Sequence, residues 1–260
     1  MTTLLSDAVL FERTGDVGVL TMQFAPHNLV GKTLSEALIA GLNNAYSAGC
    51  RALVVRSGLR HFSAGAELGL FENGGARLHA ELDTVGVLRA FEELPIPIIA
   101  SVHGVALGGG FELALAADMI VASVSAKFGQ VEATLGLHPL MGGIQRLIDR
   151  CGMARAKEIV MLARRHDAAT LEKWNIVNRV VPDAQLSEVS MSIAQELAAG
   201  PTIAHAATKR LVNLYVNEGM RAADEGMRDI HAPLFKSGDL QRGLDAFQST
   251  GPGSAAFLGK

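Results

Sequence analysis

Short apolar runs alternate with amphipathic segments along the first two thirds of the chain. Two extended runs, at residues 8–11 and 17–22, flank the turn sequence Arg13-Thr14-Gly15-Asp16 and predict a β-hairpin. Apolar, β-branched runs bounded by turn residues predict further buried strands. These strands are expected at residues 52–55, 95–102, 119–122 and 176–181.

Helical periodicity fills the intervals between these runs. A capping box formed by Thr33 and Glu36 predicts the start of a helix that ends at Gly49. Its apolar face consists of Leu34, Leu38, Leu42 and Ala45. A second helix, ended by Pro95, is predicted from Leu78, Leu82, Val85, Leu88 and Phe91. Other helices are expected at residues 111–117, from about 144, and at 186–199 and 203–230.

This order of elements predicts an α/β fold with a parallel, layered core, because right-handed strand–helix units stack in that way. The intervals are too uneven for a strict repeat. The final third is helical and carries an apolar stripe that needs a partner, either the core or a second subunit. The stripe consists of Ile203, Ala207, Leu211 and Leu214. We therefore divide the chain into a core of residues 1–195 and a C-terminal helical region of residues 196–260.

Composition narrows the possible functions. With 49% apolar and 19% charged residues, the 260-residue chain can bury a large core. Its formal net charge of −3 and the lack of a basic stripe argue against nucleic acid or an anionic membrane as partner. Cys50 and Cys151 lie far apart, as expected of two free thiols in a reducing compartment. No signal-peptide pattern or uncharged run of membrane-spanning length is present, so we expect a cytoplasmic protein.

A glycine-rich stretch, Gly104-Val105-Ala106-Leu107-Gly108-Gly109-Gly110-Phe111-Glu112, joins a predicted buried strand to a short buried helix. Glycines leave backbone amides uncovered, and amides at a helix N-terminus favour a bound anion or a developing oxyanion. Glu112 falls in the first turn of that helix. The alternative is a purely structural turn in which Glu112 only complements the helix dipole.

Three other motifs fail. Gly31-Lys32-Thr33 resembles the end of a phosphate-binding loop, but Pro26 stands where that motif requires glycine. His61-Phe62-Ser63-Ala64-Gly65 resembles the nucleophile elbow of serine hydrolases, but begins with histidine rather than glycine. The eight histidines have no metal-ligand spacing, so no metal site is predicted.

Together, several stretches resemble the crotonase superfamily, and most closely its enoyl-CoA hydratases. Residues 62–67 are similar to F-x-A-G-A-D, residues 104–112 match G-x-A-x-G-G-G-x-E, and residues 128–132 match F-G-x-x-E. Gly142-Gly143-Ile144-Gln145-Arg146-Leu147 matches G-G-x-Q-R-L, and Asn178-Arg179-Val180-Val181-Pro182 resembles a later family landmark. The resemblance implies a spiral of repeated ββα units, with the C-terminal helices forming trimers or hexamers.

The resemblance also implies an acyl-CoA substrate and roles for particular residues. The amides of Ala66 and Gly109 would form an oxyanion hole for the thioester carbonyl, where one such donor is worth about 3 kcal/mol of barrier. Glu112 would activate water, and Glu132 would pass a proton to the α-carbon of a 2-enoyl thioester. Further substrate or CoA contacts are expected from Phe62, Ala64, Gly65, Gly108, His138 and Phe247. Coenzyme A is part of the substrate, and no metal or redox cofactor is expected.

Some positions depart from the family pattern. Glu67 replaces an aspartate, and Gly69 stands where hydratases often have a lysine near the CoA phosphates. Basic residues expected after Phe247 are also missing, with Arg60 and Lys260 as possible substitutes. His138, Leu140 and Met141 replace smaller or apolar residues, which suggests an altered acyl pocket. The alternatives to a hydratase are a double-bond isomerase, a thioester hydrolase, or a CoA-binding scaffold without turnover.

Overall fold

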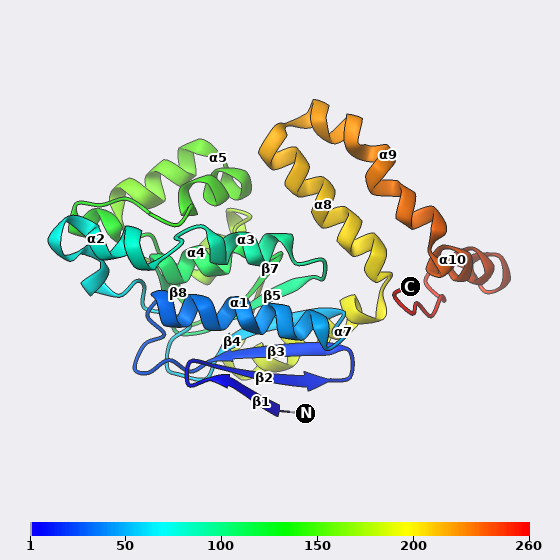
Figure 1. The fold of residues 1–260 in the computed structure, drawn as a ribbon, viewed down its shortest axis with the longest axis horizontal. Coiled ribbons are helices and arrows are strands. Elements are labelled where there is room, and N and C mark those ends of the chain that lie inside the picture. The colour runs from blue at the N-terminus through cyan, green and yellow to red at the C-terminus, as the bar shows by residue number, and fades with distance from the viewer. Residues whose placement is uncertain (1) are drawn as a thin grey trace.

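The computed structural model describes the backbone of residues 2–260 and the side chains of residues 7–78 and 80–260 (Figure 1). Its larger sheet has seven strands in the order β1-β2-β3-β4-β5-β7-β10. The N-terminal strands β1 (Thr2–Ser6), β2 (Val9–Thr14) and β3 (Val17–Met22) are antiparallel, as the predicted hairpin requires. The sheet continues in parallel through β4 (Ala52–Ser57), β5 (Ile98–Val102), β7 (Met119–Ser123) and β10 (Arg179–Val181).

A second sheet contains β6 (Val105–Leu107), β8 (Lys127–Gly129) and β9 (His166–Asp167). Twice the chain runs from the large sheet to the small sheet and then into a helix: β5, β6 and α4 (Gly109–Ala116), then β7, β8 and α5 (Gly143–Leu162). An isolated parallel bridge from Ser63 to Ala106 extends the small sheet to the preceding turn. The predicted α/β spiral of ββα units is therefore confirmed.

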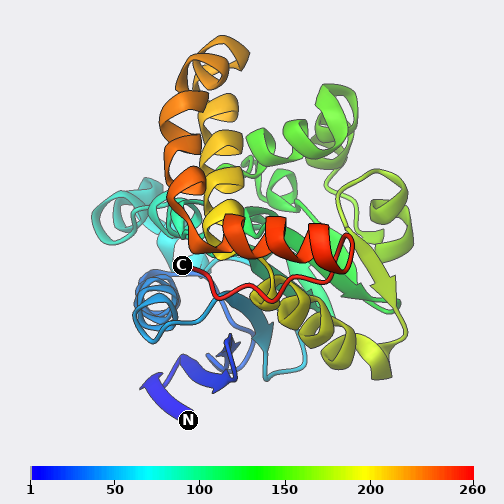
Figure 2. The same ribbon diagram turned by 90° about the vertical axis from the view of Figure 1, so that its right-hand side faces the viewer.

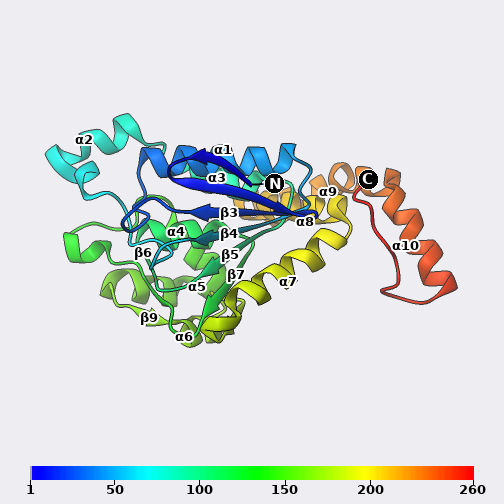
Figure 3. The same cartoon turned by 90° about the horizontal axis from the view of Figure 1, so that it is seen from below.

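Helices cover both faces of the large sheet, so its parallel strands are apolar on both sides. On one face, α1 (Lys32–Ser47) and α3 (Gly86–Glu93) pack over Leu53 and Val55 in the main core. On the other face, α7 (Leu186–Ala199) packs over Ala52 and Val54 (Figure 3). Helix α6 (Ala168–Lys173) precedes β10, and the 3-10 turns η1 (Leu68–Phe71), η2 (Glu132–Leu135) and η3 (Asp183–Gln185) lie in connections.

The C-terminal helices form an arm that projects to one side of the core (Figures 1 and 2). It consists of α8 (Thr202–Glu218), α9 (Met220–Lys236) and α10 (Gly238–Ser249). Lys209 anchors α8 to the core through Asp118 Oδ2 at 2.7 Å and the carbonyl oxygens of Phe91 and Ile96, each at 3.1 Å. The division proposed after residue 195 falls inside α7, and the arm begins after Gly200 and Pro201.

Two local predictions are wrong. The Thr33–Glu36 capping box does not start α1, because the helix begins at Lys32 with Gly31 at the N-cap and no side-chain cap. The Glu67 carboxylate lies beside Gly31, where a Cβ would require that side chain to move. The segment from Leu78 to Phe91 is not one helix. It comprises α2 (Glu72–Glu81) and α3, separated by a turn in which Asp83 Oδ1 accepts the amide hydrogens of Val85 and Gly86.

Further differences concern whole elements and their boundaries. The strand predicted at 176–181 is paired only over β10, because Ile176 and Val177 instead bury their side chains in the main core. Strands β1, β6, β8 and β9 and helix α10 are not predicted from the sequence. The single helix predicted over residues 203–230 is instead two helices that meet at Gly219, one over Thr202–Glu218 and one over Met220–Lys236. Within the described residues, none of the helices has the length and apolarity needed to cross a membrane.

Candidate active site

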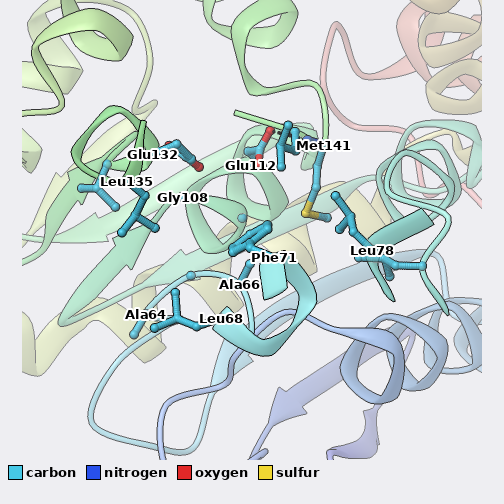
Figure 4. Close-up of a pocket in the computed structure, with 15 residues that line it drawn as sticks. Ala64, Ala66, Leu68, Phe71, Leu78, Gly108, Glu112, Glu132, Leu135 and Met141 are labelled. Atoms are coloured by element: carbon cyan, nitrogen blue, oxygen red, sulfur yellow. Dashed lines mark hydrogen bonds between the residues drawn. The ribbon is translucent and has the colours of Figure 1, made fainter. Parts of the chain in front are cut away.

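A mostly apolar cavity of about 100 Å³ lies between the loop after β4, the start of α4, η2 and helix α2 (Figure 4). Two carboxylates, those of Glu112 and Glu132, lie together in its wall, and Figure 4 shows the Glu132 carboxylate directed toward Glu112. Two backbone turns bring Ala66 and Gly109 to the same cavity. The apolar lining is Leu68, Phe71, Leu78, Leu82, Val131, Leu135, Leu140 and Met141.

The glycine-rich turn leads from β6 directly into α4. Gly108 has φ 49° and ψ −126°, a backbone conformation open to glycine, and precedes the first helical residue, Gly109. The Gly108 amide donates to the Gly129 carbonyl, while the amides of Phe111 and Glu112 donate to the Gly108 carbonyl. The Gly109 amide has no acceptor among the described residues, as expected at a helix N-terminus.

The loop after β4 supplies a second free amide. An isolated bridge aligns Ala66 with Val30, with the Val30 amide donating to the Gly65 carbonyl and the Glu67 amide to the Val30 carbonyl. These bonds fix the loop on both sides of Ala66, whose own amide has no acceptor in the part of the chain that the structure describes. Ala66 and Gly109 both line the cavity, so a carbonyl oxygen bound there can accept from two preorganised donors.

Glu112 is 1% exposed and is held by two backbone amides. Its Oε1 accepts hydrogen bonds from Gly143 N at 2.7 Å and from Met141 N at 3.0 Å. Burial raises the pKa of Glu112 to about 7, and the nearby Glu132 carboxylate acts in the same direction. The two amides lower the pKa only in part, so Glu112 can bind or release a proton near neutral pH.

Glu132 begins η2 and is partly buried. The buried Gln130 side chain, oriented with its amide nitrogen toward Glu132, lies 3.2 Å from each carboxylate oxygen. Partial burial raises the pKa of Glu132, opposed by its own backbone amide and by His138. A Cβ on Gly108 would lie 2.8 Å from Glu132 Oε1, so glycine at that position leaves room for the carboxylate.

The other residues expected to contact the substrate or CoA differ in whether they line the cavity. Ala64, Gly65 and Gly108 line the cavity together with Ala66 and Gly109. Phe62 does not reach the cavity, because its side chain is 1% exposed and packs in the main core. His138 is exposed and does not line the cavity, and its Nδ1 lies 2.7 Å from the Pro139 carbonyl oxygen.

Phe247 does not line the cavity either. It lies on α10 in the C-terminal arm, and its side chain is 61% exposed (Figure 1).

Sequence reasoning missed three site residues: Gln130, Leu78 in α2 and Leu82 directly after that helix. Gln130 is the first variable position of the F-G-x-x-E match, so the motif assigns it no role. The only indication of a site residue was a polar side chain in an otherwise apolar segment. Leu78 and Leu82 were read as one face of a helix that continues to Phe91. Leu140 and Met141 were noted as departures from the family pattern, and both line the cavity. Among the described residues, no three His, Cys, Asp or Glu side chains cluster in a way that could hold a metal ion.

Known proteins match this chain over nearly its whole length. The sequence profile of the family described as Enoyl-CoA hydratase/isomerase matches residues 12–254. A probable enoyl-CoA hydratase of Rhizobium meliloti is 34% identical, with 93% of this chain and 95% of the relative covered. The carnitinyl-CoA dehydratase of Salmonella typhi is 35% identical over 94% of this chain and 96% of the relative.

Solved structures agree. A crystal structure described as an enoyl-CoA hydratase subunit I of Geobacillus kaustophilus superposes with a TM-score of 0.90 at 31% identity, covering 97% of this chain and 98% of the other. The motifs, the spiral fold and these matches agree along the whole chain. The chain belongs to the enoyl-CoA hydratase/isomerase family of the crotonase superfamily.

Proposed function

We propose that this protein is an enoyl-CoA hydratase-type lyase, which adds water across the double bond of a 2-enoyl-CoA thioester. The observation that carries the proposal is the pairing of two proton-exchanging carboxylates, Glu112 and Glu132, with two free amides in one apolar cavity. Hydration needs a base for water, an acid for the α-carbon and a means of stabilising an enolate. We assign these three roles to Glu112, Glu132 and the two amides.

In this mechanism, the thioester carbonyl oxygen accepts hydrogen bonds from the amides of Ala66 and Gly109. Conjugation with the double bond then makes the β-carbon electrophilic, and negative charge develops on the carbonyl oxygen as water adds. Backbone donors suit this task because they are fixed before the charge develops and keep their protons at any working pH.

Glu112, when ionised, accepts a proton from water as the water oxygen bonds to the β-carbon. Glu132, when protonated, donates its proton to the α-carbon, and the enolate electrons form the new C–H bond. The product is a 3-hydroxyacyl thioester, and exchange of one proton with solvent restores the starting state. Because both pKa values are raised, the pair can hold one proton near neutral pH, and the step uses the state in which Glu132 carries that proton.

The same residues can run the reaction in reverse, as dehydration of a 3-hydroxyacyl thioester. The relatives named carnitinyl-CoA dehydratase favour this direction as the second candidate. A double-bond isomerase, a thioester hydrolase and a non-catalytic CoA-binding scaffold are the remaining alternatives. Product analysis separates all of these. We expect trans-2-butenoyl-CoA to yield 3-hydroxybutanoyl-CoA, with no 3-enoyl product and no free CoA; either of those products, or no turnover, contradicts the proposal.

We further propose assembly as a homotrimer, or as a hexamer of two trimers. Large apolar side chains on the arm support this, since contiguous exposed apolar surface is typical of subunit interfaces. They include Phe235 at 75% exposed, Phe247 at 61% and Val212 at 53%. Light scattering after size-exclusion chromatography should give three or six times the chain mass of 27.4 kDa. A monomer at micromolar concentration would contradict this.

The cofactor requirement and the location in the cell are predicted from the sequence alone. We propose that the reaction needs no metal or redox cofactor, so that exhaustive dialysis against a chelator leaves turnover unchanged. We also propose a cytoplasmic location, which cell fractionation would test.

A further inference from the structure

The residues that line the cavity are exposed at one end and buried at the other. Leu68 and Leu135 are 66% and 57% exposed and mark the mouth, whereas Leu78, Leu82 and Met141 are buried and mark the closed end. A thioester that enters at the mouth and places its carbonyl at Ala66 and Gly109 therefore directs the end of its acyl chain toward the buried group.

Met141 stands where the reacting centre meets this closed end. Its backbone amide donates to Glu112 Oε1 at 3.0 Å, so the position of the residue is tied to that of the carboxylate. Its side chain passes over Gly109, with the sulfur 3.2 Å from the point that a Cβ on Gly109 would occupy. Figure 4 shows the thioether end directed toward Leu78 and away from Glu132.

Behind Met141 lies a small apolar cluster that is separate from the main core. It is formed by Leu70, Leu78 and Leu82, with Phe71 and Leu140 partly buried against it. These side chains come from η1, α2 and the loop before α5, which are not strands of either sheet. Most of this cluster also lines the cavity, so the Met141 side chain and the cluster together bound its closed end and limit the length of an acyl chain that fits there.

We propose that Met141 is a specificity-determining residue that restricts the enzyme to short acyl chains. This inference rests on the proposed hydratase function and adds the substrate class to it. A buried thioether fills the space beside the reacting carbons, and the cavity of about 100 Å³ is small. Shortening the side chain to a methyl group enlarges the cavity between Gly109 and the apolar cluster and creates room for additional methylene groups.

The test compares kcat/KM for trans-2-butenoyl-CoA and trans-2-decenoyl-CoA in the wild type, Met141→Ala and Met141→Leu. We expect the wild type to prefer the C4 substrate by at least about tenfold, because methylene groups that a pocket cannot accept carry penalties of this size. Met141→Ala should lower the C4/C10 ratio at least about tenfold, while Met141→Leu, which keeps most of the volume, should keep the wild-type preference. Met161→Ala is the matched control, because this methionine is 69% exposed on α5 and does not line the cavity, and it should leave the ratio within about threefold.

A wild-type preference for C10, or an unchanged ratio in Met141→Ala, would overturn the inference. If Met141→Ala does not fold, Met141→Val replaces it, with an intermediate shift expected and an unchanged ratio again contradicting the proposal. Binding of saturated butanoyl-CoA and decanoyl-CoA, measured by calorimetry on the same variants, does not depend on turnover. Absence of hydration in the wild type would therefore refute the proposed function, while the change in the binding ratio still decides the role of Met141.

Discussion

The backbone amide of Gly143 donates a hydrogen bond to Oε1 of Glu112 at 2.7 Å. This contact joins the N-terminus of α5 to the first turn of α4, so two helices from successive turns of the spiral fix one carboxylate. Gly143 must lack a side chain, because a Cβ there would lie 2.8 Å from Glu112 Cγ and 2.5 Å from the amide group of the Gln130 side chain.

We therefore expect Gly143→Ala to displace Glu112 and to lower kcat by about 100-fold, since small misplacements of a catalytic group have effects of that size. Steady-state hydration kinetics measure this, with circular dichroism to verify folding. The matched control is Gly243→Ala in α10, where the nearest atom would be a permissible 3.6 Å from the new Cβ. Equal kinetics for the two variants would show that the packing around Glu112 does not limit activity.

The buried Glu112 should also make stability depend on pH. Its pKa is raised to about 7 in the folded chain, above the ordinary value of 4.5, so the folded state binds a proton more tightly than the unfolded state. Its contribution to stability is fully present below pH 4.5 and is lost as the pH rises through 7. At pH 8 the loss amounts to about 3 kcal/mol.

Glu112→Gln removes this dependence. Denaturant unfolding of the wild type and the variant should show the variant gaining about 3 kcal/mol relative to the wild type between pH 4.5 and pH 8. A difference that stays constant over this range would contradict the raised pKa of Glu112.

The Lys209–Asp118 ion pair should carry much of the attachment of the arm. The two side chains are 11% and 27% exposed, and Asp118 Oδ2 also accepts the Ile98 amide hydrogen at 2.7 Å. Removing one member of a buried pair leaves the other without its counter-charge. We expect Lys209→Met to lower the free energy of unfolding by about 3 kcal/mol.

Arg221→Met is the control for that variant. It breaks an ion pair with Glu225 whose side chains are 92% and 69% exposed, and such pairs contribute at most about 1 kcal/mol. Chemical denaturation of both variants measures the difference. Similar stabilities would mean that apolar contacts, rather than the ion pair, hold α8 on the core.

Much of the core could be predicted from the sequence because its signals are local and strong. Fully apolar runs identified β5 and β7, and the boundaries of α7 agree with those predicted. Where prediction was wrong, contacts distant in sequence decided the structure. Gly31, which lies beside the Glu67 carboxylate, is the N-cap of α1 instead of Thr33. Asp83 accepts the Gly86 amide hydrogen in a turn that separates Leu82 from Leu88.

The same contrast holds for the site. The resemblance identified Ala66, Gly109, Glu112 and Glu132, which the structure places around one cavity, although their roles stay proposals. It also suggested Phe62, a core residue, because a motif does not show which way a side chain points. The position of Gln130 beside Glu132 depends on the geometry of the turn after β8 and could not be read from spacing.

The most direct test of the two-glutamate mechanism is the hydration of trans-2-butenoyl-CoA by the wild type and by Glu132→Gln, followed through loss of the enoyl absorbance. Glutamine keeps the size of the side chain but cannot donate the proton to the α-carbon. We predict that kcat falls at least about 100-fold, while the dissociation constant for butanoyl-CoA changes less than about threefold. Turnover in Glu132→Gln within tenfold of the wild type would contradict the mechanism.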